Sequence, residues 1–283
     1  MNSPLVSTQW LSEHLNDTDL VVIDASMQVV LGKEPLVYEQ LFVIPGAKDC
    51  QLEKQFFDHN ALQANSMPTT EQFTQAAQAL GIDQQSTVVI YDNQGIYASP
   101  RVWWMFKYMG FDKVFVLDGG LPQWLAESRP TVSSFAIASQ PGNIQGGIEP
   151  QKVCDAQYVL TQIGSDTTDI IDARGAGRFN GSLPEPREGM RSGCIPSSFN
   201  LPFANVLDGF KMKSVEELQA IFAHVRSSDT GAQSAAEQRI FSCGSGITAC
   251  ILILASHVAG YEQTLLYDGS WAEWGANPDL PIA

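Results

Sequence analysis

Cys243 stands in a sequence context that favours a nucleophilic thiolate. It follows the apolar run at 239–242 and precedes a small-residue loop at 244–248, after which the stretch 249–255 has the composition of a helix. Glycines allow successive backbone N–H groups to turn toward one point, and a helix start adds partial positive charge there. Both effects favour the sulfur anion. We therefore expect Cys243 to be a nucleophile, the alternative being a buried structural cysteine beside a glycine turn.

A cluster of arginines provides a second candidate for chemistry. Its four members lie in one stretch after an apolar run that ends at Asp172, and they are Arg174, Arg178, Arg187 and Arg191. In an acidic chain such a cluster indicates an anion site, because guanidinium groups match carboxylates in bidentate geometry. The alternative for each arginine is an ion pair with Glu185, Glu188 or another nearby acid. We expect two of the four to contact a ligand.

The elements that position these residues occur twice in the chain. Four landmarks recur at offsets of 148, 151, 151 and 150: Ile23 with Ile171, Ile44 with Ile195, Tyr91 with Ser242, and Leu117 with Tyr267. Capping-box patterns at 69–72 and 214–217 both lead into helical apolar spacing. The two halves therefore read as copies of one domain.

Each half is predicted to be an α/β domain, a mainly parallel sheet with helices on both faces. Short apolar runs bounded by turn residues predict buried strands at 20–24, 87–91, 114–117, 169–172, 240–243 and 265–267. The stretch 136–150 is rich in glycine and proline and is predicted to be a linker. We expect an N-terminal domain at 1–135 and a C-terminal domain at 151–283.

Composition excludes several classes of function. Acidic residues outnumber basic ones by 31 to 16, and the net charge of -15 argues against a nucleic-acid or anionic-membrane surface. The N-terminus lacks the basic region and apolar core of a secretory signal. The 5 cysteines are scattered, without a C-x-x-C pair, which favours free thiols in a cytoplasmic protein over a disulfide framework or metal site. No metal or organic cofactor is expected.

Several motifs together resemble the two-domain rhodanese superfamily, and within it the 3-mercaptopyruvate sulfurtransferases. They are the loop from Cys243 to Ala249, the Pro-Glu-Pro-Arg segment at 184–187, the segment at 99–104 and the Leu-Asp-Gly-Gly-Leu segment at 117–121. The resemblance runs over almost the whole chain. It implies two tandem rhodanese-like domains, of which only the C-terminal one is active. Asp92 occupies the first-half position that matches Cys243, and a carboxylate cannot carry transferable sulfur.

The resemblance also implies a reaction. Sulfur passes from 3-mercaptopyruvate to a persulfide on Cys243, pyruvate leaves, and a thiol acceptor such as thioredoxin, or cyanide, then takes the sulfur. The substrate-orienting arginines of the family match Arg178 and Arg187. Ser245 matches a loop serine proposed to assist proton handling, although it can equally be a helix cap.

The remaining site residues follow from the same match. The backbone of the loop is expected to hold the sulfur anion and the substrate, through Gly244, Gly246, Ile247 and Thr248 together with Ser245. Asp172 and Arg174 are expected to support the loop without contacting the reacting atoms.

The chain departs from the family pattern at two positions. Val43 and Cys194 stand where the family signature has histidine, and none of the four histidines, His14, His59, His224 and His257, falls in a matching motif. We therefore assign no histidine base. Cys194 is interpreted as a packing substitution or, alternatively, a second redox-active thiol.

Three other functions can be weighed from the loop. Thiosulfate-preferring relatives carry basic residues after the cysteine, whereas Gly244, Ser245 and Gly246 are neutral, so mercaptopyruvate is the better donor and thiosulfate the alternative. A cysteine phosphatase would need an arginine where Ala249 stands. A non-catalytic binding module is disfavoured because the nucleophile and the arginines are both present.

Overall fold

The computed structural model describes residues 3–226 and 236–283. The chain divides into two compact units. The first contains residues 3–58, 67–149 and 208–212, and the second contains residues 59–66, 150–207, 213–226 and 236–283. The segment 59–66 thus belongs to the second unit although it lies in the first half of the sequence.

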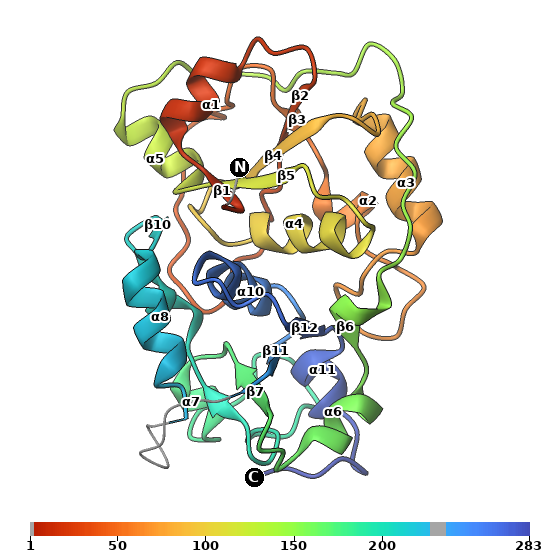
Figure 1. The fold of residues 1–283 in the computed structure, drawn as a ribbon, viewed down its shortest axis with the longest axis vertical. Helices are drawn as coiled ribbons and strands as arrows, with labels where there is room; N and C mark the ends of the chain where they lie inside the picture. The colour runs from red at the N-terminus through yellow and green to blue at the C-terminus, as the bar shows by residue number, and fades with distance from the viewer. Residues whose placement is uncertain (1–2, 227–235) are drawn as a thin grey trace. The chain divides into compact units, whose positions relative to one another are not determined.

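Five parallel strands form the sheet of the first unit (Figure 1). Their order is β1-β5-β4-β2-β3. The strands are β1 (Leu5–Val6), β2 (Leu20–Asp24), β3 (Lys48–Asp49), β4 (Thr87–Tyr91) and β5 (Val114–Leu117). The helices are α1 (Thr8–His14), α2 (Leu52–Gln55), α3 (Thr70–Ala79), α4 (Ser99–Tyr108) and α5 (Gly120–Ala126).

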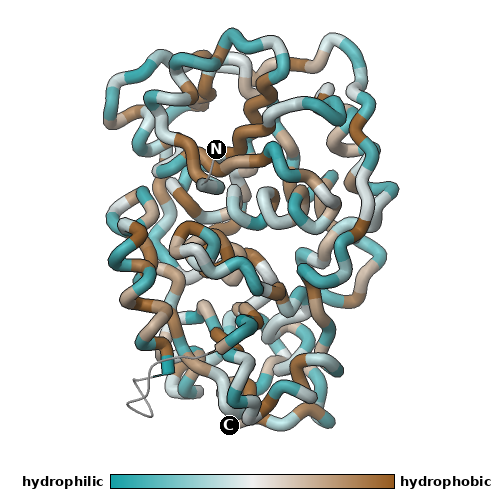
Figure 2. Tube along the Cα trace, in the orientation of Figure 1, coloured by the Kyte–Doolittle hydropathy of each residue, from teal (hydrophilic) through white to brown (hydrophobic). Residues whose placement is uncertain are grey.

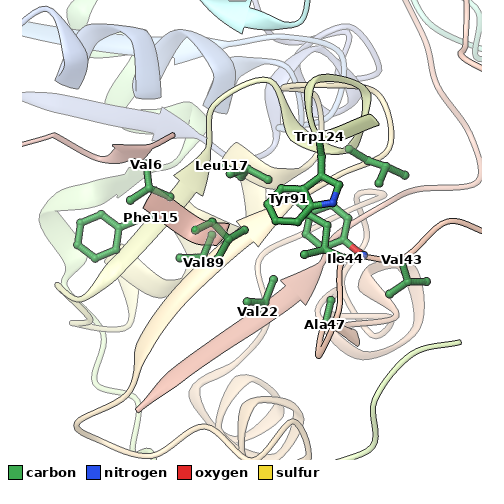
Figure 3. Packing of buried hydrophobic residues seen from close by; sticks show 12 residues of the cluster. Val6, Val22, Val43, Ile44, Ala47, Val89, Tyr91, Phe115, Leu117 and Trp124 are labelled. Atoms are coloured by element: carbon green, nitrogen blue, oxygen red, sulfur yellow. The ribbon is translucent and has the colours of Figure 1, made fainter. Parts of the chain in front are cut away.

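Helices cover both faces of this sheet because successive strand residues point in opposite directions. On one face, Val22, Val89 and Phe115 pack in one cluster with Leu11 of α1 and Trp124 of α5 (Figure 3). On the other face α4 packs against β4 and β5 and also meets α3, ring to ring. Figure 2 shows hydrophobic residues along the central strands and hydrophilic residues along many of the connecting loops.

The second unit repeats this architecture. Its sheet is parallel, with the order β6-β12-β11-β7-β8, which is the order of the first sheet with each strand replaced by its repeat. The strands are β6 (Val153–Cys154), β7 (Thr168–Asp172), β8 (Phe199–Asn200), β11 (Gln238–Ser242) and β12 (Thr264–Tyr267). The helices are α6 (Ala156–Gln162), α7 (Ala176–Phe179), α8 (Val215–Ala223), α10 (Ala249–Val258) and α11 (Ser270–Trp274).

The two faces of the second sheet are also covered. Ile170 and Ile240 pack with Val159 of α6 and Trp274 of α11. On the opposite face Phe241 meets Phe222 of α8, and α8 packs against α10. The second unit also contains two short 3-10 turns, η1 (Pro150–Lys152) and η2 (Phe203–Val206). The remaining described element is a two-stranded sheet formed by β9 (Leu207–Asp208) and β10 (Lys211–Met212).

Local sequence signals determine where two of the helices begin. Thr69 caps α3 and Ser214 caps α8, each with the reciprocal hydrogen bonds of a capping box to Gln72 and Glu217. Such a box satisfies backbone donors that a helix start otherwise leaves open. Both predicted helix starts are therefore confirmed.

The predicted fold class is confirmed: two tandem α/β domains, each with a five-stranded parallel sheet. Residues 136–149 pack along the first unit, where the amide of Gly142 donates to Gln78 and the amide of Glu149 donates to Tyr108. In the part of the chain that the structure describes, no helix is long and apolar enough to cross a membrane.

Candidate active site

Cys243 lies at the carboxyl edge of the second sheet, between the end of β11 and the start of α10. The neighbouring strand β7 ends in register with β11, and the amide of Ala173 donates to the carbonyl of Ser242 over 2.9 Å. The Cys243 residue is 1% exposed. The topology therefore brings the end of β7, with Asp172 and Arg174, to the cysteine loop.

The backbone of the loop is fixed from behind by the start of α11. The amide of Cys243 donates to the Ser270 hydroxyl over 3.2 Å. The amides of Trp271 and Ala272 donate to the carbonyls of Cys243 and Gly244, each over 3.0 Å. These bonds fix the backbone at Cys243 and Gly244, so the loop holds its shape before any ligand binds.

Several backbone amides of the loop beside Cys243 can donate hydrogen bonds to a ligand. Among the described residues, no acceptor pairs with the amides of Gly244, Ser245, Ile247 or Thr248. Gly246 has φ +80°, a conformation that favours glycine and reverses the chain at this point. Successive N–H groups in such a turn favour an anion.

Arg174 is part of a buried ion-pair network. Its guanidinium binds Asp172 and Glu185, each at 2.7 Å, and lies over the ring of Trp271 at 4.1 Å. Burial would lower the pKa of Arg174, but the two carboxylates outweigh it and raise that pKa. Arg174 and Asp172 therefore lie behind the site, where they hold Glu185.

Arg178 and Arg187 differ in how their charges are balanced. Arg178 donates through Nε and Nη2 to Glu185, whose side chain is only 3% exposed. Arg187 donates through Nη1 to the carbonyl of Gly244 over 3.3 Å and through Nη2 to the Ser245 hydroxyl over 3.0 Å. Within the described ranges, no carboxylate pairs with Arg187.

Both guanidinium groups lie against the loop. A methyl group placed on the Cα of Gly244 would lie 3.1 Å from Nη2 of Arg178 and 3.7 Å from Nη1 of Arg187. Gly244, the residue after Cys243, is therefore flanked by two cations. This arrangement suits a small carboxylate-bearing substrate, because each guanidinium offers paired donors.

Arg191, the fourth arginine of the cluster, has a structural partner set. It donates to the carbonyls of Trp274, Gly275, Asn277 and Leu280. These hydrogen bonds hold the end of α11 and the segment that follows it against Arg191. The cluster thus separates into Arg174 and Arg191, which hold the fold, and Arg178 and Arg187, which lie at the loop.

Ser245 does not cap the following helix, since α10 has no side-chain cap and the Ser245 hydroxyl accepts two other bonds. One comes from Arg187. The other comes from Asn65, whose Nδ2 lies 2.9 Å from Oγ. Asn65 was missed by the sequence analysis, because no pattern around it marks a site and the contact joins residues 180 positions apart.

The equivalent loop of the first unit shows what such a loop can hold. Asp92, which is fully buried, stands in the place of Cys243. One carboxylate oxygen accepts from the Gln94 amide, and the other accepts from three amides and one hydroxyl at 2.7 to 2.9 Å, contributed by Tyr97, Ala98 and Ser99. The first loop is therefore filled by its own anion.

Val43 and Cys194, which stand where the family signature has histidine, lie in different environments. Val43 is fully buried and pairs with Val132 through a backbone bridge. Cys194 is half-buried, pairs with Ala283 through its backbone, and has its sulfur 3.7 Å from the Ala283 carbonyl. Burial raises the pKa of the Cys194 thiol, which disfavours the redox-active alternative.

Comparison with known proteins agrees with this architecture. The model of the rhodanese-like domain matches residues 7–127 and again residues 155–277. The chain belongs to the rhodanese family. It is 37% identical over 99% of its length to the mitochondrial thiosulfate/3-mercaptopyruvate sulfurtransferase 1 of Arabidopsis thaliana, of which it covers 78%.

Relatives from Escherichia coli are similar to the chain over nearly their full length. The chain is 35% identical over 98% of its length to the 3-mercaptopyruvate sulfurtransferase of Escherichia coli K12, covering 96% of that protein. The crystal structure of SseA from Escherichia coli superposes with a TM-score of 0.81 at 32% identity, covering 95% of this chain and 99% of that one. These rhodanese relatives are sulfurtransferases, and the chain is an enzyme of this class.

Proposed function

We propose that the protein transfers the sulfur of 3-mercaptopyruvate through a persulfide on Cys243 to a thiol or cyanide acceptor, and that it releases pyruvate. The observation that carries the proposal is the flanking of the Cys243 loop by Arg178 and Arg187, at 3.1 and 3.7 Å from a methyl position on Gly244. The name of the Escherichia coli relative supports the same substrate, and the name of the Arabidopsis relative includes both thiosulfate and 3-mercaptopyruvate.

The first half-reaction forms one bond and breaks another. The Cys243 thiolate attacks the substrate sulfur, an S–S bond forms, and the C–S bond breaks with its electron pair becoming the enolate of pyruvate. The substrate sulfur, now the outer sulfur of the persulfide, gives up its proton as the enolate takes one up. The products are pyruvate and a persulfide anion on Cys243.

The site residues have separate roles in this step. Arg187 binds the substrate carboxylate, because no carboxylate of the described residues balances its charge. Arg178 uses Nε and Nη2 for Glu185, and its Nη1 donates to the carboxylate end of the substrate. The vacant amides of Ser245, Ile247 and Thr248 hold the persulfide anion. Asp172 and Arg174 keep Glu185, and through it Arg178, in place.

Thiosulfate is the alternative donor, and charge argues against it as the preferred one. Glu185 neutralises Arg178, and the loop at 244–246 is uncharged, so the site carries less positive charge than a dianion favours. The ratio of turnover with the two donors distinguishes these alternatives. Faster turnover with thiosulfate than with mercaptopyruvate would show that thiosulfate is the preferred donor.

Intact mass measured after treatment with mercaptopyruvate tests the proposed function. One added sulfur is expected, removable by thiol and mapping to Cys243 in a peptide digest. Cys243→Ser is expected to remain unmodified, and the matched variant Cys194→Ser is expected to load as the wild type does. Loading of Cys243→Ser, or no loading of the wild type, would overturn the proposal.

A further inference from the structure

The segment 59–66 brings a side chain to the reactive loop from a distant part of the sequence. It belongs to the same compact unit as Cys243. Asn65 adopts φ +62°, a left-handed conformation that asparagine tolerates better than most residues. Its Nδ2 donates to Oγ of Ser245 over 2.9 Å. The neighbouring Ser66 hydroxyl closes the turn by donating to the Gln63 carbonyl over 2.8 Å.

Asn65 and Arg187 both donate to the Ser245 hydroxyl, so this hydroxyl can act only as a donor toward a third group. A serine oxygen has two lone pairs and one proton. One lone pair accepts from Asn65 and the other from Nη2 of Arg187. In the described part of the chain, no acceptor takes the Ser245 proton. The hydroxyl can therefore only donate, and its proton is available to a bound substrate.

We infer that Asn65 is a positioning residue that aims the Ser245 proton at the carbonyl oxygen of the donor substrate, the oxygen that becomes the enolate. This inference rests on the proposed function. Asn65 does not contact the reacting atoms. It acts by filling the lone pair of Ser245 that Arg187 leaves open, which fixes the rotation of the hydroxyl.

The chemical benefit lies in the charge that develops during sulfur transfer. When the C–S bond breaks, its electron pair moves toward the carbonyl oxygen, and a donor already aimed at that oxygen stabilises the transition state more than the ground state. An amide side chain does not ionise at neutral pH. The direction of the Ser245 proton therefore stays the same across the neutral range.

Asn65→Gly is the principal test variant, because it removes the amide and keeps the left-handed backbone. We expect kcat with mercaptopyruvate to fall by about tenfold, with KM changed by less than about twofold, since substrate binding by the arginines is retained. The matched control is Leu62→Ala in the same segment, whose side chain is 93% exposed and which should keep wild-type kcat.

Asn65→Asp tests the direction of the hydrogen bond. Aspartate has the same shape and also tolerates the left-handed backbone, but its carboxylate can only accept. It would take the Ser245 proton away from the substrate, so we expect kcat at saturating substrate to fall further than in Asn65→Gly. A smaller loss in Asn65→Asp would overturn the assigned direction.

A double-mutant cycle separates positioning from a general structural effect. If Asn65 acts through Ser245, then Asn65→Gly should cause no further loss of kcat in a Ser245→Ala background. A residue that only supported the fold would lower the rate by a similar factor in both backgrounds. Multiplicative losses would therefore overturn the inference.

Single-turnover loading of Cys243 distinguishes this inference from the proposed function. Slower persulfide formation from mercaptopyruvate in Asn65→Gly than in the wild type supports both. Loading at the wild-type rate in the variant overturns the role of Asn65 and leaves the proposed function standing. Failure of the wild type to load overturns the proposed function, and the role of Asn65 with it.

Discussion

Arg178 donates to both carboxylate oxygens of Glu185, so its charge is balanced inside the protein before any substrate binds. Glu185 also accepts from Arg174, which is paired with Asp172. These two guanidinium groups and two carboxylates compensate one another. Arg187 is then the cation that gives the site its net positive charge among the described residues.

Glu185→Gln should change donor preference. Removing this carboxylate leaves Arg178 uncompensated, and the extra positive charge favours a dianion over a monocarboxylate. We expect KM for thiosulfate to fall by about threefold to tenfold, while kcat with mercaptopyruvate falls because Arg178 is no longer held. Steady-state kinetics with both donors measures the shift. An unchanged ratio of the two kcat/KM values would show that Glu185 has no part in specificity.

Arg187→Ala should impair mercaptopyruvate binding more than Arg178→Ala does. A charge-assisted hydrogen bond contributes about 1.5–3 kcal/mol, so KM should rise by about 10- to 100-fold without Arg187. The rise should be smaller for Arg178→Ala, because that charge is already neutralised by Glu185. The reverse order in measured KM values would contradict this division of roles.

Gly244→Ala should reduce activity with little loss of stability. Its methyl group would lie 3.1 Å from Nη2 of Arg178, which has to shift by a few tenths of an ångström. A displacement of this size at a binding group lowers kcat/KM by about tenfold. Gly147→Ala, where a methyl group would meet no atom within 4 Å, is the control for the substitution itself. Wild-type kcat/KM in Gly244→Ala would place Arg178 outside the reaction.

Asp92→Ala should destabilise the first unit strongly. The substitution leaves the amides and the hydroxyl that surround this carboxylate without an acceptor in a buried loop. Each unsatisfied buried donor costs about 1–3 kcal/mol, so we expect a loss of at least about 3 kcal/mol in the free energy of unfolding. Urea denaturation measures it. Asp92→Asn, which keeps one acceptor oxygen, should lose less, and equal losses would contradict the argument.

Asp24 should make stability depend on pH in the mildly acidic range. Burial raises the pKa of Asp24 to about 6 from an ordinary 3.8, so the folded state binds more protons than the unfolded state between these values. The free energy of unfolding should therefore be highest below pH 4 with respect to this group. It should fall by up to about 3 kcal/mol as pH rises to 6.

Asp24→Asn is the matched variant for this pH dependence. Urea unfolding from pH 4 to 7 should show a smaller fall in Asp24→Asn than in the wild type. The exposed variant Asp17→Asn serves as the control. If the difference in the free energy of unfolding between wild type and Asp24→Asn does not vary with pH, Asp24 is not the cause of the pH dependence.

Much of the fold could be predicted from the sequence because its signals are local or repeated. The strands at 20–24, 87–91 and 114–117 begin and end where the apolar runs do. The capping boxes at Thr69 and Ser214 start helices as expected. The two-residue strands β1, β3, β6 and β8 were not predicted, since two residues carry no periodicity and their strand conformation comes from pairing with a neighbour.

The candidate site was only partly predictable for a related reason. Cys243 and the arginines lie in segments whose composition is unusual, so their types and spacing mark them. The contact between Asn65 and Ser245 arises from tertiary folding, and a single asparagine in a polar segment gives no signal of it. The different charge balance of Arg178 and Arg187 likewise arises from tertiary folding, because of these two guanidinium groups only that of Arg178 lies within hydrogen-bond distance of Glu185.

The tethered carboxylate of Asp92 has a consequence for how the two copies of the domain respond to their surroundings. A ligand that is covalently part of the chain cannot be diluted or competed away, so dissolved anions such as sulfate have no entry to the first loop at any concentration. Among the described residues no carboxylate occupies the loop at Cys243, so we expect those same ions to compete with the substrate there.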